Sequence, residues 1–231
     1  MSGDSTQTKK LLIFMHIPKT AGSTLGELIN QQYTKNISCY RGDESENEKD
    51  VIRLKDEIEK SDSLKGHFYF GVHHYLSKPS IYITMFRNPI ERIISLYYYI
   101  LREKNNRLYE KVKNMSLDEF VKSEELAIEN VNQQTRYLCG GRTPDLETAK
   151  KNLSAHFSFG IMELFDDSIR LMSKELGWKN IHYIKRNVNG NSPPITSIAE
   201  KTIHKIIENN TLDIELYHYA RQLLINKKKT K

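Results

Sequence analysis

The chain has 231 residues, which suits one α/β domain, and 38% of them are hydrophobic, enough for a sizeable core. Its 35 basic and 29 acidic residues give a formal net charge of +6, which favours acidic ligands or substrates. The only two cysteines, Cys39 and Cys139, exclude a disulfide framework and a four-cysteine zinc site. No apolar stretch is long enough to cross a bilayer, so we expect no membrane span.

The first predicted element is a buried strand over the apolar run Leu11–Ile17, which Pro18 ends because proline has no N–H for a sheet ladder. A short polar loop follows, and a helical pattern then begins. A helix leaves the N–H groups of its first turn without intrahelical acceptors, and its dipole favours negative charge there. Gly22 permits close approach of a ligand, and Lys19 adds a cation. We therefore predict an anion-binding loop, made of Pro18, Lys19, Thr20, Ala21, Gly22, Ser23 and Thr24.

This phosphate loop, residues 18–24, differs from the Walker pattern G-x-x-x-x-G-K-[ST], in which the lysine stands just before the helix. Here Lys19 comes early, directly after Pro18. The order His-Ile-Pro-Lys-Thr-Ala-Gly-Ser-Thr over residues 16–24 resembles the 5′-phosphosulfate loop of carbohydrate-type sulfotransferases. That family includes heparan sulfate 2-O-sulfotransferases and bacterial relatives. The resemblance implies that residues 18–24 bind the donor 3′-phosphoadenosine 5′-phosphosulfate (PAPS).

Residues 65–76 hold three of the eight histidines. The segment resembles the part of the same family in which a histidine after glycine is the catalytic base, and His67 matches that position. Some relatives carry a second histidine two residues earlier, where this chain has Lys65, so we expect a mechanism with a single histidine. From the residues alone, the alternative is that these histidines cap a strand and pack under a loop.

A second strand followed by a helix is predicted around Arg87. Residues 81–86 form a β-type run, and Pro89 fits the first turn of a helix that continues to residue 101. Arg87 at the strand end and Ser95 in the helix resemble the family's clamp for the 3′-phosphate. A guanidinium suits phosphate because its planar fork offers two parallel donors. A surface salt bridge at the strand end is the alternative for Arg87.

The remaining elements are expected as follows: a loop at 31–48, helices at 49–60 and 116–122 (with a capping box), a helix from Thr143-Pro144, strands at 156–161 and 181–184, and helices at 164–178, 196–208 and 212–225. Residues 130–141 resemble the family's Asn-x-Gln-Thr segment near the acceptor cleft. There Arg136 could meet an anionic acceptor or a neighbouring carboxylate. Lys185 or Arg186, after the last strand, could close over the bound nucleotide.

These elements predict an α/β fold: a P-loop-like three-layer structure with a central parallel sheet and helices on both faces. We expect one domain over residues 10–226, a disordered lead at 1–9 and a basic tail at 227–231. In such folds ligands bind outside the carboxyl ends of the strands, where both phosphate segments would lie.

The resemblance covers Leu11 to about Leu224. It implies a sulfotransferase that moves a sulfuryl group from PAPS to a hydroxyl group and leaves the product PAP. We expect the hydroxyl group to belong to a sugar. His67 would be the base, and Lys19 would stabilise the leaving phosphate, with no metal required. We expect no nucleic-acid partner. Eukaryotic relatives carry a membrane anchor that this chain lacks, so we expect a cytoplasmic enzyme. Two alternatives remain: a P-loop kinase or nucleoside triphosphatase, and a non-catalytic nucleotide-binding module.

Overall fold

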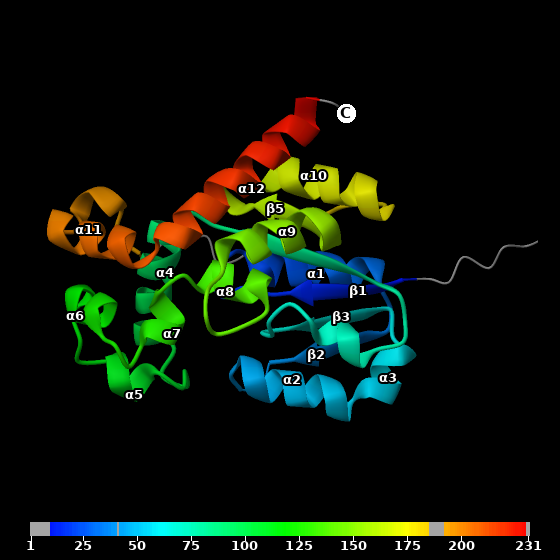
Figure 1. Cartoon of the computed structure of the whole chain (residues 1–231), viewed down its shortest axis with the longest axis horizontal. Coiled ribbons are helices and arrows are strands. Elements are labelled where there is room, and N and C mark those ends of the chain that lie inside the picture. The colour runs from blue at the N-terminus through cyan, green and yellow to red at the C-terminus, as the bar shows by residue number, and fades with distance from the viewer. Residues whose placement is uncertain (1–9, 41, 185–191, 230–231) are drawn as a thin grey trace, which may run out of the picture.

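The computed structural model describes residues 10–40, 42–184 and 192–229. Its centre is a five-stranded sheet with the order β2-β3-β1-β4-β5, in which every neighbouring pair is parallel (Figure 1). The predicted parallel sheet is therefore confirmed. The strands are β1 (Leu11–Met15), β2 (Asn36–Cys39), β3 (Ser63–Gly66), β4 (Ser80–Phe86) and β5 (Phe157–Ile161).

Helices connect and cover the strands. They are α1 (Gly22–Gln32), α2 (Glu44–Arg53), α3 (Lys55–Glu59), α4 (Pro89–Arg102), α5 (Tyr109–Val112), α6 (Leu117–Lys122), α7 (Ala127–Asn130), α8 (Gln133–Cys139), α9 (Leu146–His156), α10 (Phe165–Leu176), α11 (Glu200–Asn209) and α12 (Thr211–Lys229). Short 3₁₀ turns occupy Val72–Tyr75, Met162–Leu164 and Ile195–Ser197.

Side chains of β1 alternate between the two faces of the sheet, as the period of a strand requires. Leu12 and Phe14 pack with α1 and α10 on one face. Leu11 and Ile13 belong to the core on the opposite face, which α2, α3, α8, α9 and α12 cover. Helices thus lie on both faces, which confirms the predicted three-layer arrangement.

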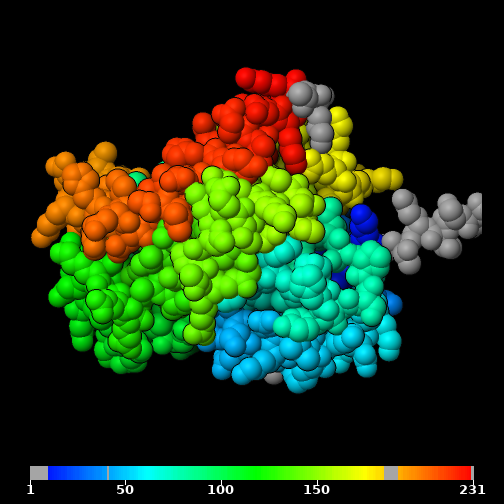
Figure 2. Space-filling model, in the orientation of Figure 1, coloured from blue at the N-terminus to red at the C-terminus, as the bar shows by residue number. Residues whose placement is uncertain are grey.

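A separate group of helices packs beside the sheet. The outer half of α4 joins α5, α6 and α11 around its own apolar cluster, which includes Ile93, Ile100, Phe120 and Ile206. In Figures 1 and 2 this group is the green and orange lobe at the left. Among the described residues, none of the helices combines the length and apolar character needed to cross a membrane.

Several elements of the structure differ from those predicted from the sequence. The expected loop at 31–48 contains strand β2 and the start of α2, which Asp43 caps by accepting a hydrogen bond from the N–H of Glu46 at 3.0 Å. The single helix predicted at 49–60 is two helices, α2 and α3, which meet at Leu54. The predicted start at Thr143-Pro144 was two residues early, because Asp145 is the cap of α9. Helix α12 runs to Lys229, beyond the predicted end.

The strand predicted at 181–184 does not form. Instead of pairing with the sheet through its backbone, this segment packs by its side chains: Ile181 and Tyr183 join the cluster under α1 and α10, while Ile184 is 81% exposed. The prediction was wrong because apolar side chains satisfied by packing give the same short pattern as a strand.

Candidate active site

Three loops meet at one edge of the sheet. Strands β3, β1 and β4 are parallel neighbours, so their carboxyl ends lie side by side. The loop after β1 is the phosphate loop, β3 leads into His67, and β4 leads into Arg87. The fold therefore brings the three predicted segments together at the place where ligands of parallel sheets bind.

The phosphate loop has an unusual backbone. Lys19 and Ala21 have φ angles of 69° and 68°, in the left-handed region that side chains disfavour. Thr20 is buried and its hydroxyl donates a hydrogen bond to the carbonyl oxygen of Ile17 at 2.8 Å. Helix α1 then begins at Gly22. Strained conformations of this kind persist where the surrounding structure holds them, and they cluster at ligand sites.

Lys19 directs its ammonium group toward helix α4, where Nζ lies 3.8 Å from the centre of the Tyr99 ring. Burial, reinforced by the positive charges of Arg102 and Arg87, lowers the pKa of Lys19 to about 8. A cation in these surroundings gains from the arrival of an anion, because the anion offsets both the desolvation and the repulsion.

Arg87 is 6% exposed and contacts the phosphate loop directly. Its Nη1 donates to the carbonyl oxygen of Lys19 at 3.3 Å, and its Nη2 lies 3.4 Å from the Glu91 carboxylate. Burial lowers the pKa of Arg87, but an arginine stays charged at neutral pH. A small cavity of about 150 Å³ adjoins this guanidinium; it is lined by Arg87, Glu91, Ile94, Ser192, Pro193, Pro194 and Ile195.

Ser95, the other residue predicted to bind the 3′-phosphate, is buried on α4. Residues four apart lie on one face of a helix, so Glu91, Ser95 and Tyr99 form a row. Arg87 reaches the first member of the row and Lys19 the last. Ser95 therefore lies between the two cations on the face that borders the phosphate loop.

The Asn-x-Gln-Thr segment positions Arg87. The N–H of Arg87 donates to Gln134 Oε1 and Gln134 Nε2 donates to the carbonyl oxygen of Arg87, both at 3.0 Å. Asp213 of α12 in turn accepts from the N–H groups of Gln134 at 3.0 Å and Thr135 at 2.7 Å. Arg136 donates to the backbone carbonyl of Ala127 at 3.0 Å, so its described hydrogen bond is to neither of the partners considered from the sequence.

His67 is held in one tautomer. Its Nδ1 lies 2.7 Å from the carbonyl oxygen of His16. Because a carbonyl oxygen can only accept, Nδ1 must carry the hydrogen, and Nε2 keeps the lone pair that can take a proton. Burial lowers the pKa of His67 below its ordinary value, so the ring is neutral at pH 7. These are the properties of a general base.

His16 supports His67 from the side. The two ring centres are 4.6 Å apart, and burial together with His67 and Lys19 keeps the pKa of His16 well below its ordinary value. The His16 ring also reaches the start of α1: a methyl group built on Gly22 would lie 1.8 Å from His16 Nε2. Gly22 is thus required for the fit of this imidazole as well as for close approach of a ligand.

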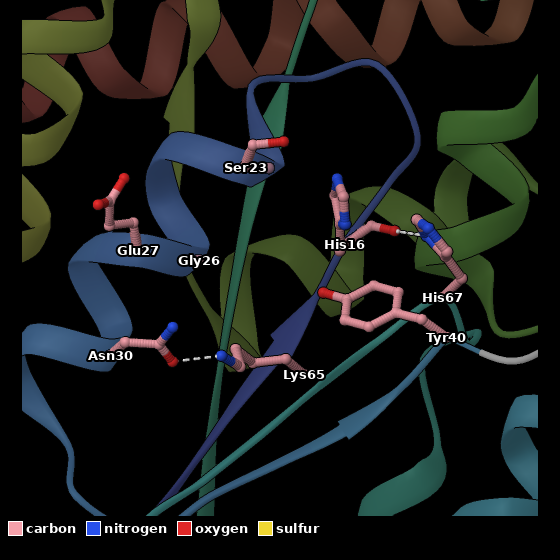
Figure 3. A pocket seen from close by; sticks show the side chains of 9 residues that line it. His16, Ser23, Gly26, Glu27, Asn30, Tyr40, Lys65 and His67 are labelled. Atoms are coloured by element: carbon pink, nitrogen blue, oxygen red, sulfur yellow. Dashed lines mark hydrogen bonds between the residues drawn. The ribbon is translucent and has the colours of Figure 1, made fainter. Parts of the chain in front are cut away.

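A pocket of about 470 Å³ opens beside His67, on the face of the sheet that carries α1 (Figure 3). Its lining residues are His16, Gly22, Ser23, Gly26, Glu27, Asn30, Tyr40, Lys65 and His67. The phosphate loop separates this pocket from the smaller cavity at Arg87, because β1 lies between β3 and β4. The arrangement offers one space beside the base and one beside the guanidinium.

The other histidines of the segment lie elsewhere. His73 Nδ1 is 2.9 Å from the hydroxyl oxygen of Tyr82, and its ring centre is 4.0 Å from that of His74. Neither histidine lines the pocket. Lys185 and Arg186 fall outside the described residues.

Sequence reasoning missed six residues of the pocket: His16, Gly26, Glu27, Asn30, Tyr40 and Lys65. Two of them carried a usable signal. His16 opens the loop motif, and Lys65 stands two residues before His67, the spacing that places side chains on the same face of a strand. Asn30 and Tyr40 could not be found this way, because the fold brings them in from a helix and from the end of an edge strand.

Known proteins that are similar to this chain are sulfotransferases. The model of the sulfotransferase family matches residues 5–220. The chain is similar to heparan sulfate 2-O-sulfotransferase 1 of Gallus gallus and of Mus musculus, with 27% identity over 195 residues in each case, covering 72% of this chain and 54% of the relative. It therefore spans about half the length of these relatives. Among solved structures it is similar to mouse sulfotransferase SULT7A1 complexed with PAP, with a TM-score of 0.45 and 13% identity, covering 87% of this chain and 64% of that one.

Proposed function

The chain belongs to the sulfotransferase family, and we propose that it transfers a sulfuryl group from PAPS to a hydroxyl group of a saccharide. The observation that carries the proposal is the hydrogen bond from His67 Nδ1 to the His16 carbonyl. It leaves Nε2 as a proton acceptor in a pocket that the phosphate loop also lines.

The donor would bind across the phosphate loop. Its 5′-phosphosulfate end fits the N-terminus of α1, where backbone N–H groups and the helix dipole favour an anion. Its 3′-phosphate fits Arg87 and Ser95, since Arg87 borders the second cavity. Lys19 lies between these two positions, and its carbonyl oxygen accepts a hydrogen bond from Arg87.

In the reaction, His67 Nε2 takes the proton of the acceptor hydroxyl while the hydroxyl oxygen attacks sulfur. The bond between sulfur and the bridging oxygen breaks, and its electron pair leaves on the 5′-phosphate of PAP. Negative charge therefore grows at the phosphate loop. Lys19 and the N–H groups at the start of α1 stabilise that charge, and donors fixed in advance lower the barrier most effectively.

A saccharide acceptor is supported by two features. The relatives act, by name, on heparan sulfate, which is a polysaccharide. The pocket beside His67 also has an aromatic wall, because Tyr40 is 40% exposed and its ring centre lies 4.8 Å from that of His67. Binding sites commonly combine such an apolar surface with a few fixed polar groups.

The direct test is transfer of radiolabelled sulfate from PAPS to a panel of saccharides, with and without EDTA. We expect labelled product in both conditions, since Lys19, Arg87 and N–H groups supply the positive charge. Strict dependence on Mg²⁺, or transfer of phosphate from ATP, would instead support a kinase. PAP binding without turnover on any acceptor would support a non-catalytic module.

The cytoplasmic location expected from the sequence is also a proposal, which cell fractionation would test.

A further inference from the structure

Lys65 is a buried cation in the wall of the pocket. It stands in the middle of the sheet, in register with Phe14 of β1 and Ser38 of β2, and is 7% exposed. Its Nζ donates to Asn30 Oδ1 at 2.5 Å. In the described part of the chain, its ammonium forms no ion pair with a carboxylate, although surface lysines of this chain form several.

A charge in this position is costly unless an anion joins it. An ammonium has three donors, and the described partner is one neutral amide oxygen. Burial accordingly lowers the pKa of Lys65, and no neighbouring charge opposes that shift. Glu27 lines the same pocket, but its carboxylate points away from Lys65 (Figure 3). The pocket therefore presents a held, desolvated cation toward its interior.

Lys65 and His67 are well placed to act on one molecule. They are two residues apart at the end of β3, which corresponds to about 7 Å along an extended chain. Both line the same pocket, and in Figure 3 Tyr40 lies between them. A sugar that presents a hydroxyl to His67 can thus reach Lys65 with a group on the same or a neighbouring ring.

We propose that Lys65, held by Asn30, binds an acidic group of the acceptor, a carboxylate or a sulfate, and so selects acidic sugars and sets which hydroxyl meets His67. This inference rests on the proposed function. We assign Lys65 to the acceptor because it lies two residues before the proposed base His67 at the end of β3, whereas Arg87, proposed for the 3′-phosphate of the donor, follows β4 on the other side of β1.

The test compares Lys65→Met, which keeps length and loses charge, with Lys60→Met, an exposed lysine after α3. Three oligosaccharides serve as acceptors: one with uronate carboxylates, its carboxyl-reduced form, and the carboxyl-reduced form carrying sulfate groups. We expect Lys65→Met to raise KM by at least about tenfold for an acidic acceptor, as for loss of one charge-assisted contact. KM for the neutral acceptor and the affinity for PAP should stay within about threefold. Lys60→Met should match the wild type throughout.

The outcomes are distinguishable. A loss confined to the uronate acceptor identifies a carboxylate site, and a loss confined to the sulfated acceptor identifies a sulfate site. Equal KM changes for acidic and neutral acceptors would overturn the inference, as would no change at all. If the wild type binds PAP but sulfates none of the three, the proposed function fails. Calorimetry of the same oligosaccharides with the PAP complex then still tests whether Lys65→Met weakens binding of the acidic ones.

Discussion

The Nδ1 of His67 and the carbonyl oxygen of His16 are 2.7 Å apart, so the backbone of the strand that opens the phosphate loop also sets the tautomer of the proposed base. In the proposed reaction, one continuous segment after β1 therefore both orients the base and stabilises the leaving group. A shift of residues 16–22 would disturb both at once.

Replacing His67 should lower the turnover rate and leave the affinity for the donor nucleotide nearly unchanged. Loss of a general base typically lowers a rate by about a hundred- to ten-thousand-fold, so His67→Ala should lower kcat by that much. PAP affinity, measured by calorimetry, should stay within about threefold, because His67 addresses the acceptor. His73→Ala is the matched control and should lose much less, since His73 lies outside the pocket. A folded His67→Ala enzyme with near-normal turnover would direct the search for the base elsewhere.

The acid limb of the pH–rate profile should lie below pH 6.5. Protonation inactivates a histidine base, and burial lowers the pKa of His67 despite the opposing effects of the His16 carbonyl and Glu44. The neutral, active form therefore persists to lower pH than for a free histidine. Tyr40→Ala removes the ring that covers His67 and should move the limb upward. A limb at or above 6.5 in the wild type would contradict this assignment.

Arg87→Ala should weaken PAP binding by about 2 kcal/mol or more, the scale of a lost charge-assisted contact. Arg170→Ala removes an exposed arginine on α10 and should leave the affinity unchanged. Because Arg87 is buried, urea unfolding of both variants should accompany the calorimetry. Unchanged PAP affinity in a folded Arg87→Ala protein would remove this residue from the site.

PAP affinity should fall as the pH rises through about 8. Lys19 has a pKa of about 8 in the free protein. A bound phosphate favours its charged form and raises that pKa, so binding takes up a proton above pH 8 and weakens by up to about tenfold per pH unit. Lys19→Met should bind PAP more weakly and lose this dependence. Binding that is equally strong at pH 7 and pH 9.5 would show that Lys19 does not meet the phosphates.

Gly22→Ala should destabilise the protein by about 1–3 kcal/mol, the usual range for overpacking, because the added methyl group meets the His16 ring. The loss should be smaller in a His16→Ala background, which a double-mutant cycle by urea unfolding would measure. Gly26→Ala is the control on the same helix, where an added methyl group has nothing within 4 Å. It should be neutral or stabilising by up to about 1 kcal/mol. Equal effects at both glycines would argue against the contact.

Much of this structure could be predicted from sequence, because its strongest elements carry local signals. The runs that became β1, β4 and β5 are apolar, and α4, α6 and α10 have clear caps or apolar stripes. Strands β2 and β3 were missed because they are four residues long and half polar, and the partners of their polar side chains come from distant segments. Ser63, for example, donates to Asn36 at 2.5 Å.

The same division applies to the site. His67 is assigned from the resemblance of its segment to the family, whereas the phosphate loop and Arg87 each follow an apolar strand, so a linear pattern marks them. The groups that hold them do not: Gln134 lies 47 residues from Arg87, and Asp213 lies 79 residues from Gln134. Contacts between such distant residues are set by the tertiary fold and leave no periodicity in the chain.

The dependence of Arg87 on Gln134, and of Gln134 on Asp213, also bears on how the protein is made. Synthesis runs from the N-terminus, so a ribosome releases the phosphate loop, His67 and Arg87 long before it reaches Asp213. Until α12 docks, the N–H groups of Gln134 and Thr135 lack the carboxylate that fixes them, and the Arg87 peptide lacks a fixed clamp. The proposed donor site is therefore held in place only after α12 has been synthesised and has docked against α8.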